Sequence, residues 1–438
     1  MTATTDARDA ETAPPPTVSP RERLRLVAVL GLLVALGPFT IDLYLPALPT
    51  ITEDLGTTEA AVQLTLTGTL AGLAVGQLVI GPLSDAFGRR RPLLAGTALH
   101  VVASALCVVA PDVAVLGVLR VAQGLGAAAA TVVALAVVRD LFSGLAAATM
   151  FSRLMLVLGT SPVLAPTIGG ELLRWTEWRG IFIALALLGA VLMALSALAL
   201  RETLPPSRRR RGGVRDTAAA YVALLRDRPY VGLVLVIGLS MASLLAYVAG
   251  SSFVLQDQFG LSEQQFGLAF AANAVAVIGA TQLNVRLLRR WGPQQLLVAA
   301  LAVGTGAGLV MLALAATGTG GLAGILVPLF VSLAGFGMAG PNAQALALLR
   351  HGEAAGTAAA LLGAAQFGIG SLASPLVGAL GNDGTAMAAL VAGGMAAAAL
   401  VLVTVVRPWQ LAGFEASTVR LAAEGGTTGA ADPGAARR

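Results

Sequence analysis

Twelve apolar runs, most of them about 20 residues long, follow one another through the chain, usually with only short polar loops between them. A run of this length crosses the roughly 30 Å hydrocarbon core of a bilayer as an α-helix. Only 12% of the residues are charged, against about a quarter in a typical soluble chain. The sequence therefore predicts an all-α membrane protein with twelve transmembrane helices and no soluble domain. The runs cover residues 24–46, 60–80, 92–110, 113–138, 145–170, 180–200, 230–254, 264–285, 294–316, 321–349, 354–379 and 385–406.

The two halves of the chain resemble each other. The longest internal loop, residues 201–228, separates six runs from six, and Leu164–Gly170 of the fifth run is echoed by Leu372–Gly378 of the eleventh. Two similar bundles in parallel orientation are typical of repeat transporters, whose substrate site lies at the midplane between them. We therefore expect two pseudo-symmetric six-helix bundles, 21–200 and 229–406, joined by a cytoplasmic linker at 201–228. The tails, 1–20 and 407–438, are expected to be disordered.

The arginines indicate the orientation in the membrane. They gather before the first run and after the even-numbered runs, whereas the alternate loops carry mainly acidic side chains, with Arg174 and Arg179 as exceptions. By the positive-inside rule both termini face the cytoplasm, and the protein is a multi-pass protein of the cell (inner or plasma) membrane. The net charge of +5 therefore reports topology and not a nucleic-acid partner. The basic positions are Arg21, Arg23, Arg25, Arg89–Arg91, Arg139, Arg208–Arg211, Arg289, Arg290 and Arg350.

Several classes of protein lack support in this sequence. One cysteine, Cys107, and two histidines, His100 and His351, cannot form a disulfide or a metal cluster, so we expect no metal and no cofactor. His100, inside the third run, is expected to be an ordinary buried histidine. The sequence contains no phosphate-binding loop, zinc-protease motif or nucleophile elbow, so we expect no enzyme activity. The first run is too long for a signal peptide and should remain as a membrane helix.

Asp42 stands out because it places a carboxylate inside the first run. An ionised side chain at the bilayer centre costs about 2.5–3.5 kcal/mol on insertion scales, so such residues usually face a bundle interior and have a partner. Arg120, inside the fourth run, is the expected partner. Asp42 lies about 8 Å from the end of its helix and Arg120 about 10 Å from the start of its own, so their depths match. We expect this pair to couple proton movement to transport.

The segment between the second and third runs carries a recognisable motif, Gly81–Pro92. Gly81 allows close helix approach, Gly88 allows a tight reversal, and Asp85 can cap a helix or pair with an arginine such as Arg89. The motif resembles the signature loop of the major facilitator superfamily, G-x-x-x-D-R-x-G-R-R, with Ala86 where the family usually has arginine. The resemblance implies that the loop latches the two bundles in the outward-facing state.

Two further motifs refine the resemblance. Arg120-Val121-Ala122-Gln123-Gly124 is similar to the family's R-x-x-Q-G motif, which is associated with proton transfer. The segment from Gly159 to Gly170, including Pro166 and Gly169, resembles the motif of antiporters, with Ala165 in place of its second glycine. Small residues and prolines let such a helix pack closely or bend. With Thr40–Pro49, these motifs look like those of the Bcr/CflA branch of drug:proton antiporters, which export drugs such as bicyclomycin or chloramphenicol.

The resemblance implies a transporter that exports drugs or other small amphiphilic molecules in exchange for protons by alternating access. We expect it to be a monomer. Its partners would be the solute, protons and the lipid bilayer. Ordinary interhelical packing explains each candidate residue of the substrate cavity equally well. These candidates are Phe39, Tyr44, Gln63, Gln123 and Tyr247.

Three other functions stay open at this point. A proton-coupled metabolite or nutrient symporter could use the same scaffold, and the fifth-run motif argues for export instead. A membrane-embedded enzyme lacks a catalytic motif. A structural or receptor protein would have no use for a costly charged pair inside the membrane.

Overall fold

The computed structural model describes residues 20–142, 144–209, 214–349 and 355–410. Most of both predicted tails, Arg350 and His351 lie outside these ranges. Within them the chain is helical, which confirms the predicted fold class. Eleven of the described helices are long and apolar enough to cross a membrane.

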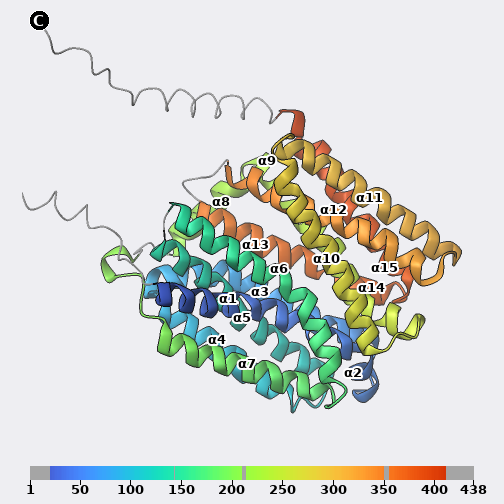
Figure 1. The fold of residues 1–438 in the computed structure, drawn as a ribbon, viewed down its shortest axis with the longest axis horizontal. Helices are drawn as coiled ribbons and strands as arrows, with labels where there is room; N and C mark the ends of the chain where they lie inside the picture. The colour runs from blue at the N-terminus through green and yellow to red at the C-terminus, as the bar shows by residue number, and fades with distance from the viewer. Residues whose placement is uncertain (1–19, 143, 210–213, 350–354, 411–438) are drawn as a thin grey trace, which may run out of the picture.

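One further helix completes the predicted set of twelve. It is α4, Arg90–Cys107, which is 18 residues long and packs beside α5 and α7. Its two leading arginines and the internal His100 make it less apolar than the other spans. Because it runs parallel to neighbours that cross the membrane, we count α4 as the twelfth span (Figure 1).

The helices pack in two groups of six spans, which we call the first and second bundles (Figure 1). The domain boundaries predicted above stay a prediction. The first bundle contains α1 (Pro20–Asp42), η2 (Leu45–Ala47), α2 (Leu48–Asp54), α3 (Glu59–Phe87), α4, α5 (Val113–Leu141), α6 (Gly144–Leu172) and α7 (Trp178–Ala199). The second contains α9 (Arg228–Ser252), η4 (Phe253–Gln258), α10 (Glu263–Leu287), α11 (Pro293–Thr317), α12 (Gly321–Leu349), α13 (Ala355–Ser371), α14 (Ala373–Ala379), α15 (Gly384–Val401) and η6 (Leu402–Val406).

Helix boundaries follow from local chemistry. Asp112 begins α5 by accepting a hydrogen bond from the backbone N–H of Val115 at 2.9 Å, and Asp383 begins α15 in the same way with Ala386 at 2.7 Å. Ser262 and Gln265 form a reciprocal capping box at the start of α10. These caps satisfy N–H groups that have no partner inside the helix. Polar capping residues in the short loops thereby fix where spans begin.

The linker between the bundles is more structured than the sequence predicts. It contains η3 (Pro206–Arg208) and a helix, α8 (Val214–Leu225), that packs on α9 and α13. Leu224 is buried, and the Tyr221 hydroxyl donates to the carbonyl of Leu78 in α3 at 3.4 Å. The sequence predicts a linker at 201–228 but not the helix α8, whose side chains contact both bundles.

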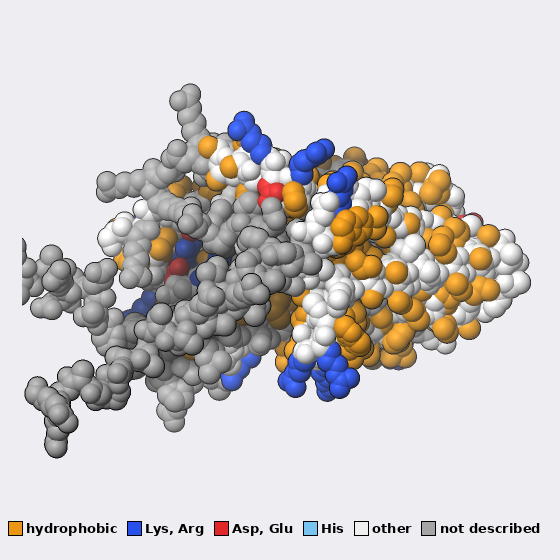
Figure 2. Space-filling model, turned by 90° about the horizontal axis from the view of Figure 1, so that it is seen from above, with side chains coloured by type: hydrophobic (Ala, Val, Ile, Leu, Met, Phe, Trp, Pro, Cys, Tyr) orange, Lys and Arg blue, Asp and Glu red, His pale blue; other side chains and the backbone are white. Residues whose placement is uncertain are grey.

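The two ends of the molecule differ in charge. We call the end that carries Arg89–Arg91 and Arg289–Arg290 the basic end, and the opposite end the far end. In the space-filling view, arginine side chains gather toward the basic end, and exposed hydrophobic side chains cover the surface from there to the far end (Figure 2). An apolar surface of this extent is what lipid tails would cover.

Candidate functional site

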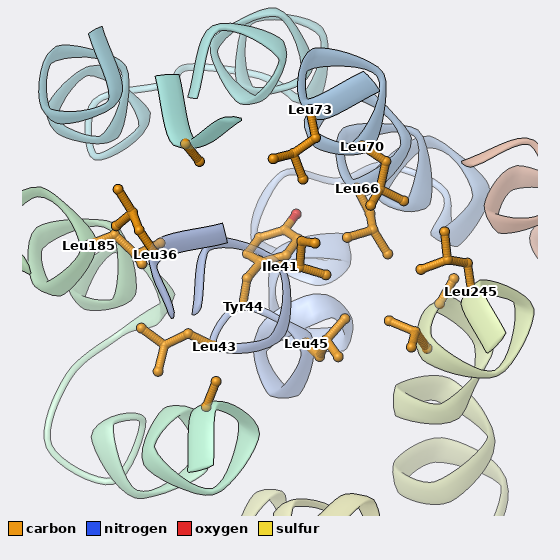
Figure 3. Packing of buried hydrophobic residues seen from close by; sticks show 14 of the residues in the cluster. Leu36, Ile41, Leu43, Tyr44, Leu45, Leu66, Leu70, Leu73, Leu185 and Leu245 are labelled. Atoms are coloured by element: carbon orange, nitrogen blue, oxygen red, sulfur yellow. The ribbon is translucent and has the colours of Figure 1, made fainter. Parts of the chain in front are cut away.

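The first span breaks directly after Asp42. The last regular hydrogen bond of α1 runs from the N–H of Leu43 to the carbonyl of Phe39 at 3.2 Å. Pro46 and Pro49 follow, and because proline has no N–H the carbonyls of Asp42 and Leu45 lose their regular helical donors. The chain restarts as η2 and then α2. Figure 3 shows the break enclosed by apolar side chains, with Leu66 and Leu70 of α3 on one side and Leu245 of α9 beside it.

Asp42 is the last residue of α1 and lies directly at this break. It is 6% exposed, and among the described residues its carboxylate accepts no hydrogen bond and forms no ion pair. Tyr247 of α9, in the second bundle, lies within electrostatic range of this carboxylate. The structure thus holds an unpaired carboxylic acid at the contact between the bundles.

Arg120 lies inside the first bundle and does not contact Asp42. Its Nη1 donates to the carbonyl of Thr40 at 3.0 Å and to Oε1 of Gln123 at 2.6 Å. The guanidinium also lies 4.4 Å from the ring centre of Tyr44 and 5.7 Å from that of Phe182. Its Nε and Nη2 are buried without a partner among the described residues.

The predicted Asp42–Arg120 ion pair is therefore absent from this conformation. The sequence argument used depth along each helix, which cannot give the direction of either side chain. The Arg120 guanidinium lies over the Tyr44 ring and binds Gln123 in the first bundle, whereas Asp42 lies within electrostatic range of Tyr247 in the second. Ion pairs within the described chain join Arg89 with Asp85 and Asp140, Arg174 with Glu171, and Arg179 with Asp54.

A chain of polar side chains links Arg120 to α4. Nε2 of Gln123 donates to Oγ of Ser104 at 2.7 Å, and Oγ of Ser104 donates to the carbonyl of His100 at 2.7 Å. Nε2 of His100 lies 2.9 Å from Oγ1 of Thr40. Because Thr40 gives its one hydroxyl proton to Leu36 at 2.6 Å, His100 must be the donor in that contact.

This network includes His100, which the sequence analysis did not count among the functional residues. With Nε2 protonated, its Nδ1 is a buried acceptor that has no partner in the described structure. The signal available in the sequence was a histidine alone in an apolar run, which by itself does not reveal a contact with Thr40, two residues before Asp42. The network connects the break in α1 to α4 and α5.

The predicted cavity residues are mostly engaged with other side chains. Tyr44 is fully buried with its hydroxyl 2.7 Å from Oγ1 of Thr65, Gln123 belongs to the network above, and Phe39 is half-buried. Tyr247 stacks on Phe270 with ring centres 5.1 Å apart. Of these candidates, the structure brings Tyr44 and Gln123 together around Arg120, and Tyr247 close to Asp42. It does not bring all five around one open cavity.

Gln63 lies at the contact between the bundles. Its side chain is fully buried and bonded to the second bundle, so in this conformation it does not line a substrate cavity. Elsewhere in the second bundle a pocket of about 20 Å³ is lined by residues that include Ser240, Gln344 and Gln366. This space holds about one water molecule, far less than a drug requires.

Hydrogen bonds between the bundles gather at the far end. Oγ of Ser252 donates to the carbonyl of Leu45 at 2.7 Å, and Nε2 of Gln264 donates to the carbonyl of Gly170 at 3.1 Å. Nε2 of Gln256 adds a bond to Pro46 at 3.3 Å. The break in α1 is therefore part of the surface on which the second bundle closes.

The loop after α3 forms a network within the first bundle. Arg89 pairs with Asp85, with Asp140 at the end of α5 at 2.8 Å, and with the hydroxyl of Ser84 at 2.8 Å. Gly88 has a φ of +88°, which confirms the tight reversal. Gly81 behaves differently from the prediction, since an added Cβ would meet nothing within 4 Å. Close helix approach therefore does not explain Gly81 in this conformation.

Glu202, which follows α7, accepts hydrogen bonds from the backbone N–H groups of Arg89 at 2.8 Å and Arg90 at 3.2 Å. Burial alone would raise the pKa of Glu202, but these bonds and that from Leu204 hold the pKa below its ordinary value. Glu202 is thus ionised at neutral pH, and its contribution to stability is lost as the pH falls through the lowered pKa. The segment after α7 is anchored to the motif loop by this charge.

Gly169 and Gly170 of α6 allow two different close contacts. A Cβ at Gly169 would overlap the carbonyl oxygen of Leu43, the residue after Asp42. A Cβ at Gly170 would lie 2.6 Å from the carbonyl oxygen of Glu263 in α10. Pro166 lies one turn earlier in the same helix, and its carbonyl oxygen would lie 3.2 Å from a Cβ at Gly267 of α10. The motif thereby joins the α1 break to the second bundle.

Comparison with known proteins identifies the family of the chain. Residues 30–375 match the Major Facilitator Superfamily. The chain belongs to this superfamily. Its members are transporters and not enzymes, as the sequence predicted.

Relatives at moderate identity include proteins named for drug resistance. The chain is 38% identical to the Bacillus subtilis MFS-type transporter YdgK over 84% of this chain and 91% of that one. It is 32% identical to a bicyclomycin resistance protein homologue of Haemophilus influenzae, covering 82% and 89% of the two chains. It is 30% identical to the multidrug resistance protein MdtL of Klebsiella pneumoniae, covering 87% and 96%.

Solved structures share the fold at low identity. A D-xylose-proton symporter matches with a TM-score of 0.68 and 19% identity, covering 89% of this chain and 98% of that chain. A bacterial homologue of the lysosomal transporter Spinster, inward-facing and unoccupied, matches with a TM-score of 0.67 and 16% identity, covering 90% and 97%. These matches show the major facilitator fold.

The contact at Gly169 gives a first prediction for this major facilitator protein. Gly169→Ala should lower transport several-fold and reduce thermal stability, because overpacking costs about 1–3 kcal/mol and here would displace the α1 break. Gly159→Ala is a matched control in the same motif, since its Cβ would meet Ile278 at an ordinary 3.7 Å. The measurement compares the melting temperatures of the purified variants, followed by size-exclusion chromatography, and their transport rates. Equal behaviour of the two variants would contradict the prediction.

Proposed function

We propose that this major facilitator transporter exports drugs or other small amphiphilic molecules in exchange for protons. The observation that carries the proposal is the unpaired, buried carboxylate of Asp42 at the contact between the bundles. Ionisable groups inside a membrane protein mark ion or proton pathways by default, because their burial is costly. The relatives named for bicyclomycin and multidrug resistance support the choice of solute.

The proposed cycle uses Asp42 as the exchange site. A proton from outside binds the carboxylate and removes the cost of holding an unpaired charge between the bundles. After the bundles rock to open the basic end, the solute enters and the proton leaves to the cytoplasm. The bundles then rock back with the solute bound, and release of the solute outside completes one exchange. A membrane potential of 100 mV supplies about 2.3 kcal/mol for each charge that moves.

Arg120 has a positioning role in this proposal. Through the Thr40 carbonyl it holds the last turn of α1 against α5, and through Gln123 it connects to α4. A change in the direction of the Arg120 side chain toward Asp42 would favour the ionised carboxylate. Loading and release of the proton would thereby follow the movement of α1.

The second bundle indicates the chemistry of the solute. The polar groups deep in its described spans are neutral, and Nδ2 of Asn342 donates to Oδ1 of Asn284 at 2.7 Å. A surface of this kind suits amphiphilic molecules with neutral hydrogen-bonding groups. Tyr247, Asn273, Asn342, Gln344 and Gln366 are the neutral groups concerned.

The orientation belongs to the same proposal. The basic end would face the cytoplasm of a bacterial plasma membrane, by the positive-inside rule, and both termini would lie there. The conformation described above, joined at the far end, would then be closed to the outside. We propose that the protein works as a monomer.

Proton exchange in everted membrane vesicles tests the proposal. In acid-loaded vesicles that contain the protein, bicyclomycin added outside should release protons from the lumen, and vesicles without the protein should not respond. A resistance profile of a sensitive strain against a compound panel would then define the solutes. Substrate-induced alkalinisation of the medium by intact cells would instead identify a symporter and overturn the proposal of export.

A further inference from the structure

Gln63 of α3 makes more hydrogen bonds to the opposite bundle than its neighbours do. Its Nε2 donates to the carbonyl of Ala249 at 3.2 Å and to Oδ1 of Asn382 at 2.7 Å. Its Oε1 accepts from the backbone N–H of Gly378 at 3.0 Å, and its own carbonyl accepts from Oγ of Ser374 at 3.3 Å. One side chain of the first bundle thus joins α9, α14 and the turn after α14.

The backbone around Gln63 is shaped for this contact. A Cβ at Gly378 would lie 2.6 Å from Oε1 of Gln63 and 2.8 Å from Cα of Ala60, so a larger residue there would separate the bundles. Asn382 adopts a positive φ of 54°, a conformation that few side chains other than asparagine tolerate. Its Nδ2 donates to the carboxylate of Glu59, one turn before Gln63 on α3. Asn382 is therefore held between two residues of the first bundle.

Burial distinguishes the amides of Gln63 and Asn382 from those of Gln256 and Gln264 at the far end. Gln63 is completely buried and Asn382 is 7% exposed, whereas Gln256 and Gln264 are half-buried. A buried amide that loses its partners without gaining water is costly, so these bonds hold the bundles together more firmly than exposed ones do. Opening the far end must break all of them and admit water to Gln63.

We propose that Gln63, together with Asn382, is the positioning residue that holds the far end of the transporter closed. The Gln63 amide bonds form when the bundles meet at this end and are exchanged for water when they part. These bonds set the ratio of protein with the far end closed to protein with the far end open. They thereby also set the rate at which the closed far end opens again. The inference uses the alternating movement of a major facilitator protein and not the identity of the solute.

Distances between the two bundles at the far end test this inference. Spin labels at Glu177→Cys in the turn between α6 and α7 and at Thr319→Cys in the turn between α11 and α12 report the opening, in a Cys107→Ser background. Both labelled side chains are exposed. The measurement is double electron–electron resonance on the full protein in lipid nanodiscs without drug. A failure of the proposed drug export therefore leaves its outcome unaffected.

Gln63→Ala should raise the ratio of far-open to far-closed protein by about tenfold or more, since three side-chain hydrogen bonds are lost. Asn382→Gly should act in the same direction, because glycine keeps the positive φ while both side-chain bonds disappear. The effects should not add in the double variant, since the two residues share a bond. If Gln63→Ala does not fold, Asn382→Gly alone tests whether loss of this contact opens the far end.

Gln77→Ala is the matched control. Gln77 lies on the same helix and contacts Gly363 of α13, but nearer the basic end. The Gln77→Ala variant should leave the distances between the two spin labels at the far end unchanged. Distances in Gln63→Ala or Asn382→Gly that equal those of the parent, or an equal opening in Gln77→Ala, would overturn the inference.

Discussion

Asp42→Asn should abolish drug-dependent proton release from everted vesicles while the protein still inserts and remains monodisperse. Asparagine has nearly the same shape as aspartate but cannot bind or release a proton at physiological pH. Because the carboxylate forms no hydrogen bond or ion pair among the described residues, its replacement leaves no partner unsatisfied. We therefore expect proton release to fall to the level of vesicles without the protein, with thermal stability unchanged or higher.

Asp112→Asn is the matched control for this variant. Asp112 is exposed and caps α5, a role that asparagine fills as well as aspartate does. It should keep full proton exchange. Undiminished gradient-driven exchange by Asp42→Asn would refute Asp42 as the coupling residue, whatever the solute.

The fold could be predicted well because it depends on a simple property of the sequence. Runs of apolar residues long enough to span a bilayer must be helical, since lipid offers no hydrogen-bond partner to backbone N–H and C=O groups. The ends of these helices follow local capping residues such as Asp112 and Asp383. The helix α8 was missed because its apolar residues are too few to resemble a span, and they are buried by contact with α9 and α13.

The site could be predicted only in part. The sequence gives the position of a residue along its helix more readily than the direction in which its side chain points. The sequence selected Asp42 and Arg120 as the intramembrane charges, but it did not reveal that Arg120 binds the Thr40 carbonyl and Gln123 instead of Asp42. Gln63 was identified as polar and intramembrane, yet its partners Gly378 and Asn382 lie more than 300 residues away. Such contacts follow from how two bundles meet, which no local pattern reveals.

Arg120→Ala should impair coupling as severely as the loss of Asp42, but for a different reason and with a cost in stability. The change removes both hydrogen bonds of Nη1 and leaves the Thr40 carbonyl and the Gln123 oxygen without their donor. Each unsatisfied buried group costs about 1–3 kcal/mol. A space also opens beneath Tyr44, so we expect a lower melting temperature together with at least tenfold slower proton exchange, about the effect of 1.4 kcal/mol on a barrier.

Arg120→Lys separates the charge from the geometry. Lysine keeps the positive charge, but a single ammonium group cannot reproduce the planar guanidinium that stacks 4.4 Å from the Tyr44 ring centre while bonding to Thr40 and Gln123. If Arg120 acts by positioning the α1 break, Arg120→Lys should be impaired nearly as much as Arg120→Ala. Arg139→Ala, an exposed arginine near the end of the same helix, should exchange protons normally. Full activity of Arg120→Lys would show that only the charge matters, and normal coupling in Arg120→Ala would remove Arg120 from the mechanism.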